Sequence, residues 1–151
     1  MKISFKGDYA LKAILYLAHH YTTNRVVPIA EIADENDIPR KFLEQIMQIL
    51  KGAGVVDSKR GIAGGFFLRK APEKIRLGEI VRLIEGDIEP IPCAKKPPQV
   101  CCDDLATCAF KEIWVKVTMA VTDIIDSVTF ADIMERQLKL KESEQQYTYQ
   151  I

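Results

Sequence analysis

The sequence predicts a mainly α-helical protein with one small β-hairpin, followed by one long helix. Three observations support this fold class. Two short helical segments separated by a tight polar turn follow a longer apolar helix, and a glycine-rich loop joins two short apolar runs. The third observation is that residues 105–127 carry apolar side chains at helical spacing. No apolar run approaches the ~20 residues that span a bilayer, and no secretory signature is present, so a cytoplasmic protein is expected.

The predicted first domain, residues 1–86, opens with three helices. Ser4 can cap a helix over residues 4–20, a second follows Pro28 and stops at residues 36–37, and Pro39 opens a third that reaches about Lys51. The third helix is expected to turn five apolar residues inward: Phe42, Leu43, Ile46, Met47 and Leu50. Gly52 and Gly54 are expected to end it as left-handed caps.

A basic hairpin follows the third helix. Two short apolar runs, residues 55–56 and 66–68, flank a turn-rich loop, which is typical of two strands and a flexible tip. With the three helices, this hairpin predicts a winged helix-turn-helix, whose third helix enters the DNA major groove while the wing lies over the backbone or the adjacent minor groove. The formal net charge is zero, but residues 40–76 hold nine basic and three acidic residues. That excess indicates a surface that faces a polyanion.

The second half of the chain is expected to mediate dimerisation. A fourth helix over residues 77–85 ends at Gly86, and a long helix runs from about Leu105 to Ser127. Its apolar stripe is too large for a small domain to cover, so a second subunit should cover it. Thr129 and Asp132 predict a short last helix that ends near Leu140. The remaining predicted units are a cysteine-rich loop (87–108), the dimerisation helix with the last helix (109–140) and a flexible tail (141–151).

All four cysteines fall within sixteen consecutive positions: Cys93, Cys101, Cys102 and Cys108. Pro92, just before this segment, and Pro97 and Pro98 within it limit regular structure, so thiolates around a metal centre would hold it in place. The spacing matches neither paired zinc knuckles nor the common ferredoxin patterns. Cys101 and Cys102 point to opposite sides of an extended backbone, so only one of them is expected to join Cys93 and Cys108. Reduced thiols without a metal are the alternative.

Four segments together resemble the Rrf family of bacterial winged-helix transcription regulators. They are the opening residues 3–10, the run Phe42-Leu43-Glu44-Gln45, the wing residues 60–66, and the cysteines after Pro92. The likeness extends to about Leu140. The family includes an iron-sulfur cluster regulator, a nitric-oxide sensor and a regulator of cysteine metabolism. The resemblance implies a homodimer, crossed through the long helix, that binds a double-stranded DNA operator with two-fold symmetry.

The resemblance also implies an iron-sulfur cluster that controls operator binding in response to iron-sulfur status, redox state or nitric oxide. By position, Cys93, Cys102 and Cys108 match the family's ligands, and a 2Fe-2S cluster is favoured over a 4Fe-4S cluster. The position of the cluster regulator's fourth ligand, a histidine, is Lys111 here. The fourth ligand is therefore open between Asp8 from the partner subunit, as in nitric-oxide sensors, and Cys101. The alternative is a cluster-free regulator of the same fold that depends on a reactive thiol or on zinc.

Seven residues are expected to form the DNA-binding surface: Arg40, Lys41, Glu44, Gln45, Lys59, Arg60 and Gly64. Glu44 can accept a hydrogen bond from cytosine N4, and Gln45 can read adenine. The four basic residues are expected to contact phosphates or the minor groove.

An enzyme is not expected, because the sequence has no C-x-x-C site and no phosphate-binding glycine motif before a helix. A protein-interaction adaptor with a zinc-stapled loop is a further alternative, which would show no salt-sensitive DNA binding.

Overall fold

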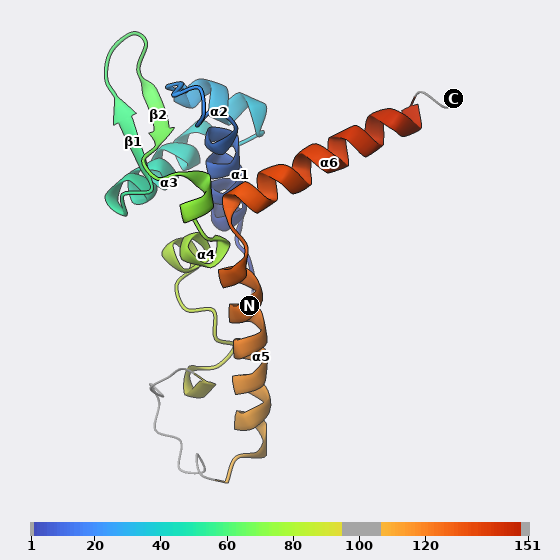
Figure 1. Ribbon diagram of the computed structural model, residues 1–151. Helices are drawn as coiled ribbons and strands as arrows, with labels where there is room; N and C mark the ends of the chain where they lie inside the picture. The colour runs from blue at the N-terminus through green and yellow to red at the C-terminus, as the bar shows by residue number, and fades with distance from the viewer. Residues whose placement is uncertain (1, 95–106, 149–151) are drawn as a thin grey trace.

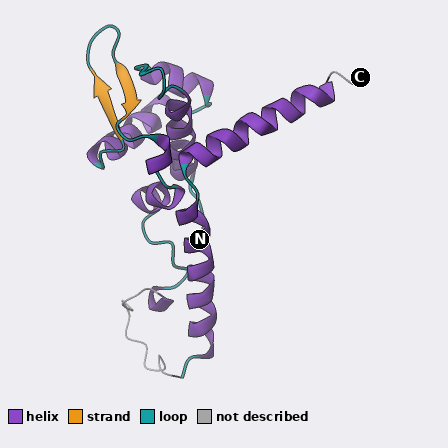
Figure 2. Ribbon diagram, in the orientation of Figure 1, coloured by secondary structure: helices purple, strands orange, loops and turns teal. Residues whose placement is uncertain are grey.

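The computed structural model describes residues 2–94 and 107–148. The elements, in chain order, are α1 (Phe5–His19), α2 (Ile29–Glu35), α3 (Arg40–Gly52), β1 (Val56–Lys59), β2 (Gly65–Leu68), the short 3-10 helix η1 (Pro72–Lys74), α4 (Leu77–Glu85), the 3-10 helix η2 (Pro92–Ala94), α5 (Ala109–Ser127) and α6 (Phe130–Thr148). Figure 1 shows α5 and α6 leaving the domain built from the earlier elements in two different directions. Figure 2 shows that the single hairpin is the only sheet among the described residues. The predicted fold class is confirmed.

Helix α1 is the centre of the N-terminal domain. It packs against α2, α3, α4, α6 and β2. Ser4 caps it as predicted, since its Oγ accepts a hydrogen bond from the Gly7 N–H (3.2 Å). The inner face of α1 is fully buried at Ala10, Ala13, Ile14, Leu17 and Ala18. This helix therefore holds the other elements of the domain around one apolar core.

Helices α2 and α3 form the predicted helix-turn-helix. The turn between them contains Asp37 in the left-handed region (φ 51°), and the Ile38 N–H donates to the Ala33 carbonyl (2.9 Å). Leu43, Ile46, Met47 and Leu50 of α3 are buried as predicted. The inward placement of Phe42 was wrong, because its side chain is 56% exposed. Phe42 lies four residues before the buried Ile46, at the edge of the buried stripe and in the first turn of the helix, so spacing alone does not decide whether it is covered.

The end of α3 differs slightly from the prediction. Gly54 takes the left-handed conformation (φ 70°), whereas Gly52 is the last helical residue. The antiparallel hairpin follows, with Val56 paired to Leu68 and Lys59 to Gly65. The hairpin is fixed to the domain by two hydrogen bonds between Val27 and Phe66 (2.8 Å each). A Cβ at Gly65 would lie 2.2 Å from the Val27 carbonyl oxygen, so a side chain there would force the hairpin away.

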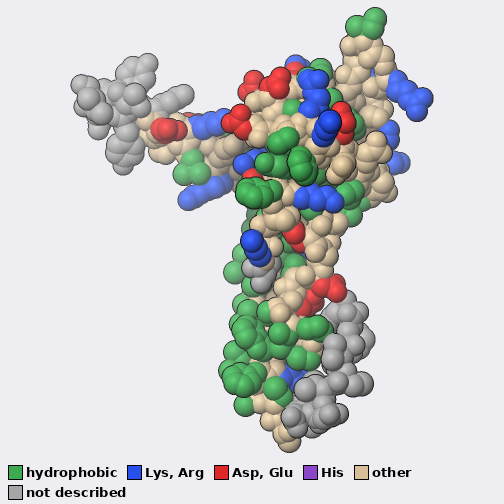
Figure 3. Space-filling model, turned by 180° about the vertical axis from the view of Figure 1, so that it is seen from behind, with side chains coloured by type: hydrophobic (Ala, Val, Ile, Leu, Met, Phe, Trp, Pro, Cys, Tyr) green, Lys and Arg blue, Asp and Glu red, His purple; other side chains and the backbone are tan. Residues whose placement is uncertain are grey.

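Helix α5 joins the domain only at its C-terminal end. Val81, Ile88 and Ile125 form a second small core between α4 and α5. The Leu77 N–H donates to the Val128 carbonyl (2.9 Å), and the Phe130 N–H donates to the Ile75 carbonyl (3.0 Å). The helix begins at Ala109 and not near Leu105 as predicted. Figure 3 shows hydrophobic side chains gathered along the surface of this helix, below the domain.

Helix α6 begins at the predicted cap and continues further than predicted. The Thr129 N–H donates to Asp132 Oδ2 (2.8 Å), and the Asp132 N–H donates back to Thr129 Oγ1 (3.2 Å). The expected end near Leu140 is corrected, because the helix runs to Thr148. Residues 139–146 contain no glycine or proline and consist largely of strong helix formers, so nothing in the local sequence stops the helix. No helix in the described ranges is long and apolar enough to cross a membrane.

Candidate nucleic-acid interface and thiol centre

The outer face of α3 carries the four residues predicted to contact DNA from this helix. Arg40, Lys41, Glu44 and Gln45 are all exposed, because the apolar stripe of α3 turns the opposite side into the core. Pro39 begins the helix without a side-chain cap, so the first N–H groups of α3 stay open to an acceptor such as a phosphate. Phe42 is also exposed, in the first turn of α3 beside this face. This surface can meet both phosphates and base edges.

The wing is held in a fixed place beside α3. Lys51, in the last turn of α3, lies 3.3 Å from Asp57 of β1 and also donates to the Ser58 hydroxyl. The pKa of Asp57 is lowered, mainly by the hydrogen bond from the Ser58 N–H and then by Lys51. Lys59 and Arg60 are exposed beyond this contact. Both predicted basic wing residues are therefore open to a polyanion.

Gly64 shapes the tip of the wing. Its N–H donates to the Gly61 carbonyl (2.9 Å), which closes a tight turn. A Cβ at Gly64 would lie 2.5 Å from the Lys59 carbonyl oxygen and 2.7 Å from that of Gly61. The structure thus gives Gly64 a steric role in the turn.

The structure places two of the predicted cluster cysteines on neighbouring elements. Cys93 lies in η2, and Cys108 is the N-cap residue of α5. Helix η2 packs against α5, as Figure 1 also shows, although residues 95–108 separate them in the sequence. Both thiols are half-buried and neither forms a disulfide. Cys101 and Cys102 lie outside the described residues.

Asp8 lies in the first turn of α1, where it pairs with Lys12 at 2.7 Å. Its hydrogen bond is the main cause of the raised pKa of Lys12. Both side chains are about half exposed, and Asp8 lines a surface pocket together with Ile3, Ser4 and Phe5. Within the described residues, no three His, Cys, Asp or Glu side chains gather closely enough to hold a metal ion. One subunit alone therefore does not bring Asp8 into a metal site with Cys93 and Cys108.

Helix α4 connects the DNA-binding domain to α5 through charged residues that the sequence analysis missed. The Ser4 N–H and Oγ both donate to Glu85 Oε1 (2.9 and 2.7 Å). Arg82 donates two hydrogen bonds to the Asp126 carboxylate (2.7 and 3.0 Å), and Arg76 donates to the Asp126 carbonyl. The hydrogen bond from Arg82 is the main cause of the lowered pKa of Asp126. These pairs lie far apart in sequence, so no local pattern signals them.

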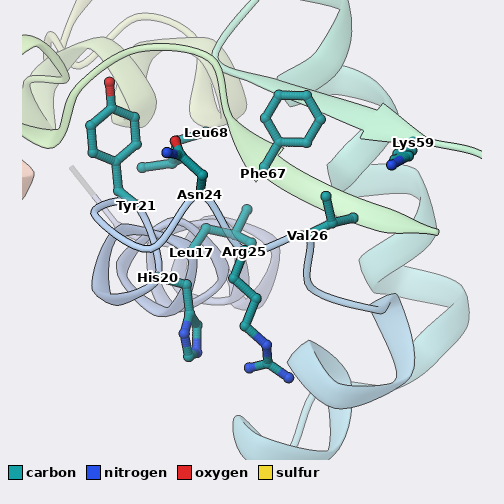
Figure 4. A pocket seen from close by; sticks show the side chains of 9 residues that line it. All are labelled: Leu17, His20, Tyr21, Asn24, Arg25, Val26, Lys59, Phe67 and Leu68. Atoms are coloured by element: carbon teal, nitrogen blue, oxygen red, sulfur yellow. The ribbon is translucent and has the colours of Figure 1, made fainter. Parts of the chain in front are cut away.

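A separate pocket of about 270 Å³ lies between the end of α1 and the hairpin. Figure 4 shows that its polar side chains do not converge: Tyr21, Arg25 and Lys59 point in different directions. Arg25 instead forms two hydrogen bonds of 2.7 Å with Glu31, which also accepts one from the Tyr16 hydroxyl (2.8 Å). Burial is the main cause that raises the pKa of Tyr16 to about 12. The hydrogen bonds of Glu31 with Tyr16 and Arg25 therefore hold α1 and α2 together.

The comparison with known proteins agrees with this architecture. Residues 3–136 match the Rrf2 family, which is described as an iron-dependent transcriptional regulator. An rrf2-like HTH-type transcriptional regulator of Rhodobacter capsulatus is 39% identical over 137 residues, which cover 87% of this chain and 91% of the relative. The solved structure of CymR, the global cysteine regulator of B. subtilis, superposes with a TM-score of 0.77 at 33% identity, covering 90% of this chain and 98% of that one. T. potens IscR gives a TM-score of 0.73 at 31% identity, covering 91% and 88%.

The match covers the winged helix-turn-helix, the cysteine segment and α5 in one alignment. The family and these relatives are transcriptional regulators, so a regulatory role is established and a catalytic one is not supported. The chain belongs to the Rrf2 family of helix-turn-helix transcriptional regulators.

Proposed function

We propose that this chain is a dimeric transcription regulator whose operator binding is controlled by an iron-sulfur cluster at Cys93, Cys102 and Cys108. The observation that carries the proposal is the packing of η2 against α5, which puts the first and last cysteines of the segment on two touching elements. The family's description as iron-dependent and the likeness to IscR support it. Three thiolates suit iron-sulfur clusters, which are held mainly by cysteine.

The uncovered apolar face of α5 supports a homodimer. Phe110, Ile113, Trp114, Val117 and Ile124 recur at helical spacing and are exposed in one subunit. Such a stripe on a long helix is stabilised when a second copy covers it. A two-fold dimer then places two α3 helices on half-sites about one helical turn of DNA apart, which predicts an operator with two-fold symmetry.

The cluster site would tie the cysteine segment to the start of α5. A bound cluster supplies iron-thiolate bonds that respond to oxidation, to nitric oxide and to iron supply. A 2Fe-2S cluster is favoured over a 4Fe-4S cluster. Asp8 is half exposed on a surface beside Ile3 and Phe5, so its carboxylate is open to a second subunit as the fourth ligand. Cys101 is the competing candidate.

The decisive experiment is anaerobic purification followed by measurement of iron, acid-labile sulfide and zinc per chain, with a visible absorption spectrum. Matched iron and sulfide in a coloured protein support the proposal, and Cys93→Ser and Cys108→Ser should lose both. Colourless protein that stays colourless after reconstitution contradicts it. That result would favour a second function, in which the chain is a cluster-free regulator that uses a thiol or zinc. The likeness to CymR supports this alternative.

Glu44 and Lys59 provide a matched test of the DNA-binding surface. Both are exposed, but Glu44 lies on α3 and Lys59 at the end of β1. We expect Glu44→Ala to change the preferred base at one position of each half-site, because Glu44 accepts a hydrogen bond from cytosine N4. Lys59→Ala should weaken binding to all duplexes and reduce the slope of log K against log salt by about 1. Selection from random duplexes and salt titrations measure both effects, and identical base preferences in the two variants would contradict the assignment.

A further inference from the structure

We infer that Ile62, at the tip of the wing, is an apolar minor-groove probe that makes the regulator prefer A·T over G·C pairs where the wing meets DNA. This inference rests on the proposed DNA-binding function and adds a specificity-determining residue to it. The basic residues predicted for the wing account for attraction to phosphates. They do not account for an apolar side chain at the outermost position.

The turn that carries Ile62 is built to project it. Residues 60–64 join the two strands, and the hydrogen bond from the Gly64 N–H to the Gly61 carbonyl (2.9 Å) closes a turn with Ile62 in its second position. Gly61 has a φ of 113°, a conformation that favours glycine, and Gly64 has no room for a Cβ. Two glycines at fixed positions thus hold Ile62 outward.

Local folding does not explain an isoleucine at this place. Turn positions favour Gly, Pro, Asn, Asp and Ser, so an isoleucine is not a typical choice there. Ile62 is fully exposed and contributes nothing to either apolar core of the chain. A large apolar side chain at the end of a hairpin is free to contact a partner, and covering it would be favourable.

The charges around Ile62 indicate what that partner is. Lys59 and Arg60 precede it and are exposed, so the tip combines two cations with one apolar end. Figure 3 shows hydrophobic side chains at the end of the projecting hairpin, with Lys and Arg side chains lower on it. Apolar side chains flanked by cations suit the minor groove, whose sugar walls are apolar and whose edges are phosphates.

Minor-groove chemistry gives the base preference. A G·C pair places the guanine 2-amino group on the floor of the groove, whereas an A·T pair has no donor there. An apolar side chain cannot accept from this amino group and would bury it unpaired, which is unfavourable. Ile62 should therefore discriminate against G·C through a single chemical group.

Inosine isolates that group, because an inosine·C pair keeps the major-groove pattern of G·C and lacks the 2-amino group. Duplexes selected from a random pool would be remade with A·T, G·C or inosine·C pairs at the positions under the wing. The full-length, cluster-loaded protein should bind the A·T and inosine·C duplexes alike and the G·C duplex about fivefold more weakly. Ile62→Ala should remove this difference, and Ile62→Leu should keep most of it.

Arg60→Ala is the matched control on the neighbouring residue. It should weaken binding to all three duplexes and lower the salt slope, while the discrimination against G·C stays. Because Ile62 is fully exposed, its variants should unfold at the wild-type denaturant concentration, so a folding defect would not be confused with lost contact. The inference is overturned if Ile62→Ala discriminates as the wild type does, or if inosine·C behaves as G·C. Absence of salt-sensitive binding to any duplex would instead refute the proposed function.

Discussion

Gly7 shows how closely α1 and α4 approach each other. A Cβ on Gly7 would lie 2.1 Å from Glu85 Oε1, the atom that accepts both hydrogen bonds from Ser4. Glu85 therefore reaches the N-terminus of α1 only because position 7 has no side chain. Through this contact, the residue before Gly86 at the end of α4 fixes the start of the central helix of the domain.

We expect Gly7→Ala to lower the free energy of unfolding by about 1–2 kcal/mol, because the new methyl group displaces the Glu85 carboxylate from Ser4. Denaturant unfolding of the purified protein measures the change. Gly52→Ala is the control, since a Cβ there meets nothing within 4 Å and Gly52 is helical. That variant should be neutral or slightly stabilised. Equal destabilisation of both variants would show that the contact with Glu85 is not the cause.

Phe42 shows the limit of sequence reasoning at single positions. Helical spacing correctly predicted Leu43, Ile46, Met47 and Leu50 as core residues, but the same spacing also admits Phe42, which is exposed although it lies four residues before Ile46. The spacing rule is physical because it follows from helix geometry, whereas an aromatic residue is also useful on a DNA-facing surface, where it can contact a thymine methyl. Hydrophobicity alone therefore does not distinguish a phenylalanine in the core from one on a DNA-facing surface.

Between elements, the pair Arg82–Asp126 is the main polar link from α4 to α5. Gly78 lies beside it, and a Cβ there would come 1.9 Å from Asp126 Oδ1. Local sequence predicted the bounds of α4 well, because an apolar stripe and Gly86 mark them. It did not predict this link, since residues 44 positions apart share no periodic signal.

The pH dependence of stability should reveal this link. The pKa of Asp126 is lowered in the folded protein, so its charge adds stability above its unfolded pKa of about 3.9, and the gain is lost as the pH falls through the folded value. Both side chains are more than a third exposed, so the bidentate pair should contribute only about 0.5–1 kcal/mol at neutral pH. Asp126→Asn should lower the free energy of unfolding by about this amount at pH 7, and the loss should shrink as the pH falls below about 4.

A double-mutant cycle with Arg82→Ala checks the assignment, because the two losses should not add. Glu135→Gln is the control, since Lys139 and Glu135 form a more exposed pair within one helix, 64% and 65% exposed. It should change stability less than Asp126→Asn at pH 7. A pH-independent effect of Asp126→Asn would contradict the ion-pair explanation.

For the whole molecule, the exposed apolar face of α5 predicts that the protein is a homodimer. Ile113 and Met119 are similarly exposed in one subunit, 56% and 52%, but only Ile113 lies in the apolar stripe. Ile113→Glu should shift the protein from dimer to monomer, because a carboxylate would be buried in the interface. Met119→Glu should stay dimeric. Sedimentation at several protein concentrations measures both, and a dimeric Ile113→Glu protein would show that another surface joins the subunits.

At this scale, the sequence predicted the order of functional parts but not their spatial relations. The winged helix, the cysteine segment and the long helix all follow from local patterns that have a physical basis. The packing of η2 against α5 and the joint between Ile75, Val128 and Phe130 depend on contacts between distant segments. For the proposed cluster, Asp8 would act from a second subunit whereas Cys101 lies in the cysteine segment itself, so one chain's sequence leaves the choice between them open.

The attachment of α5 at one end has a mechanical consequence. Backbone hydrogen bonds fix the residues just after α5 to the domain, while its other end carries Cys108. The helix has 19 residues and is therefore a lever about 28 Å long. A tilt of about 10° at its attached end would move the far end by about 5 Å, one turn of helix. Conversely, a small displacement around Cys108 would become a small rotation of the DNA-binding domain, so a coarse movement at the thiols would shift the position of α3 finely.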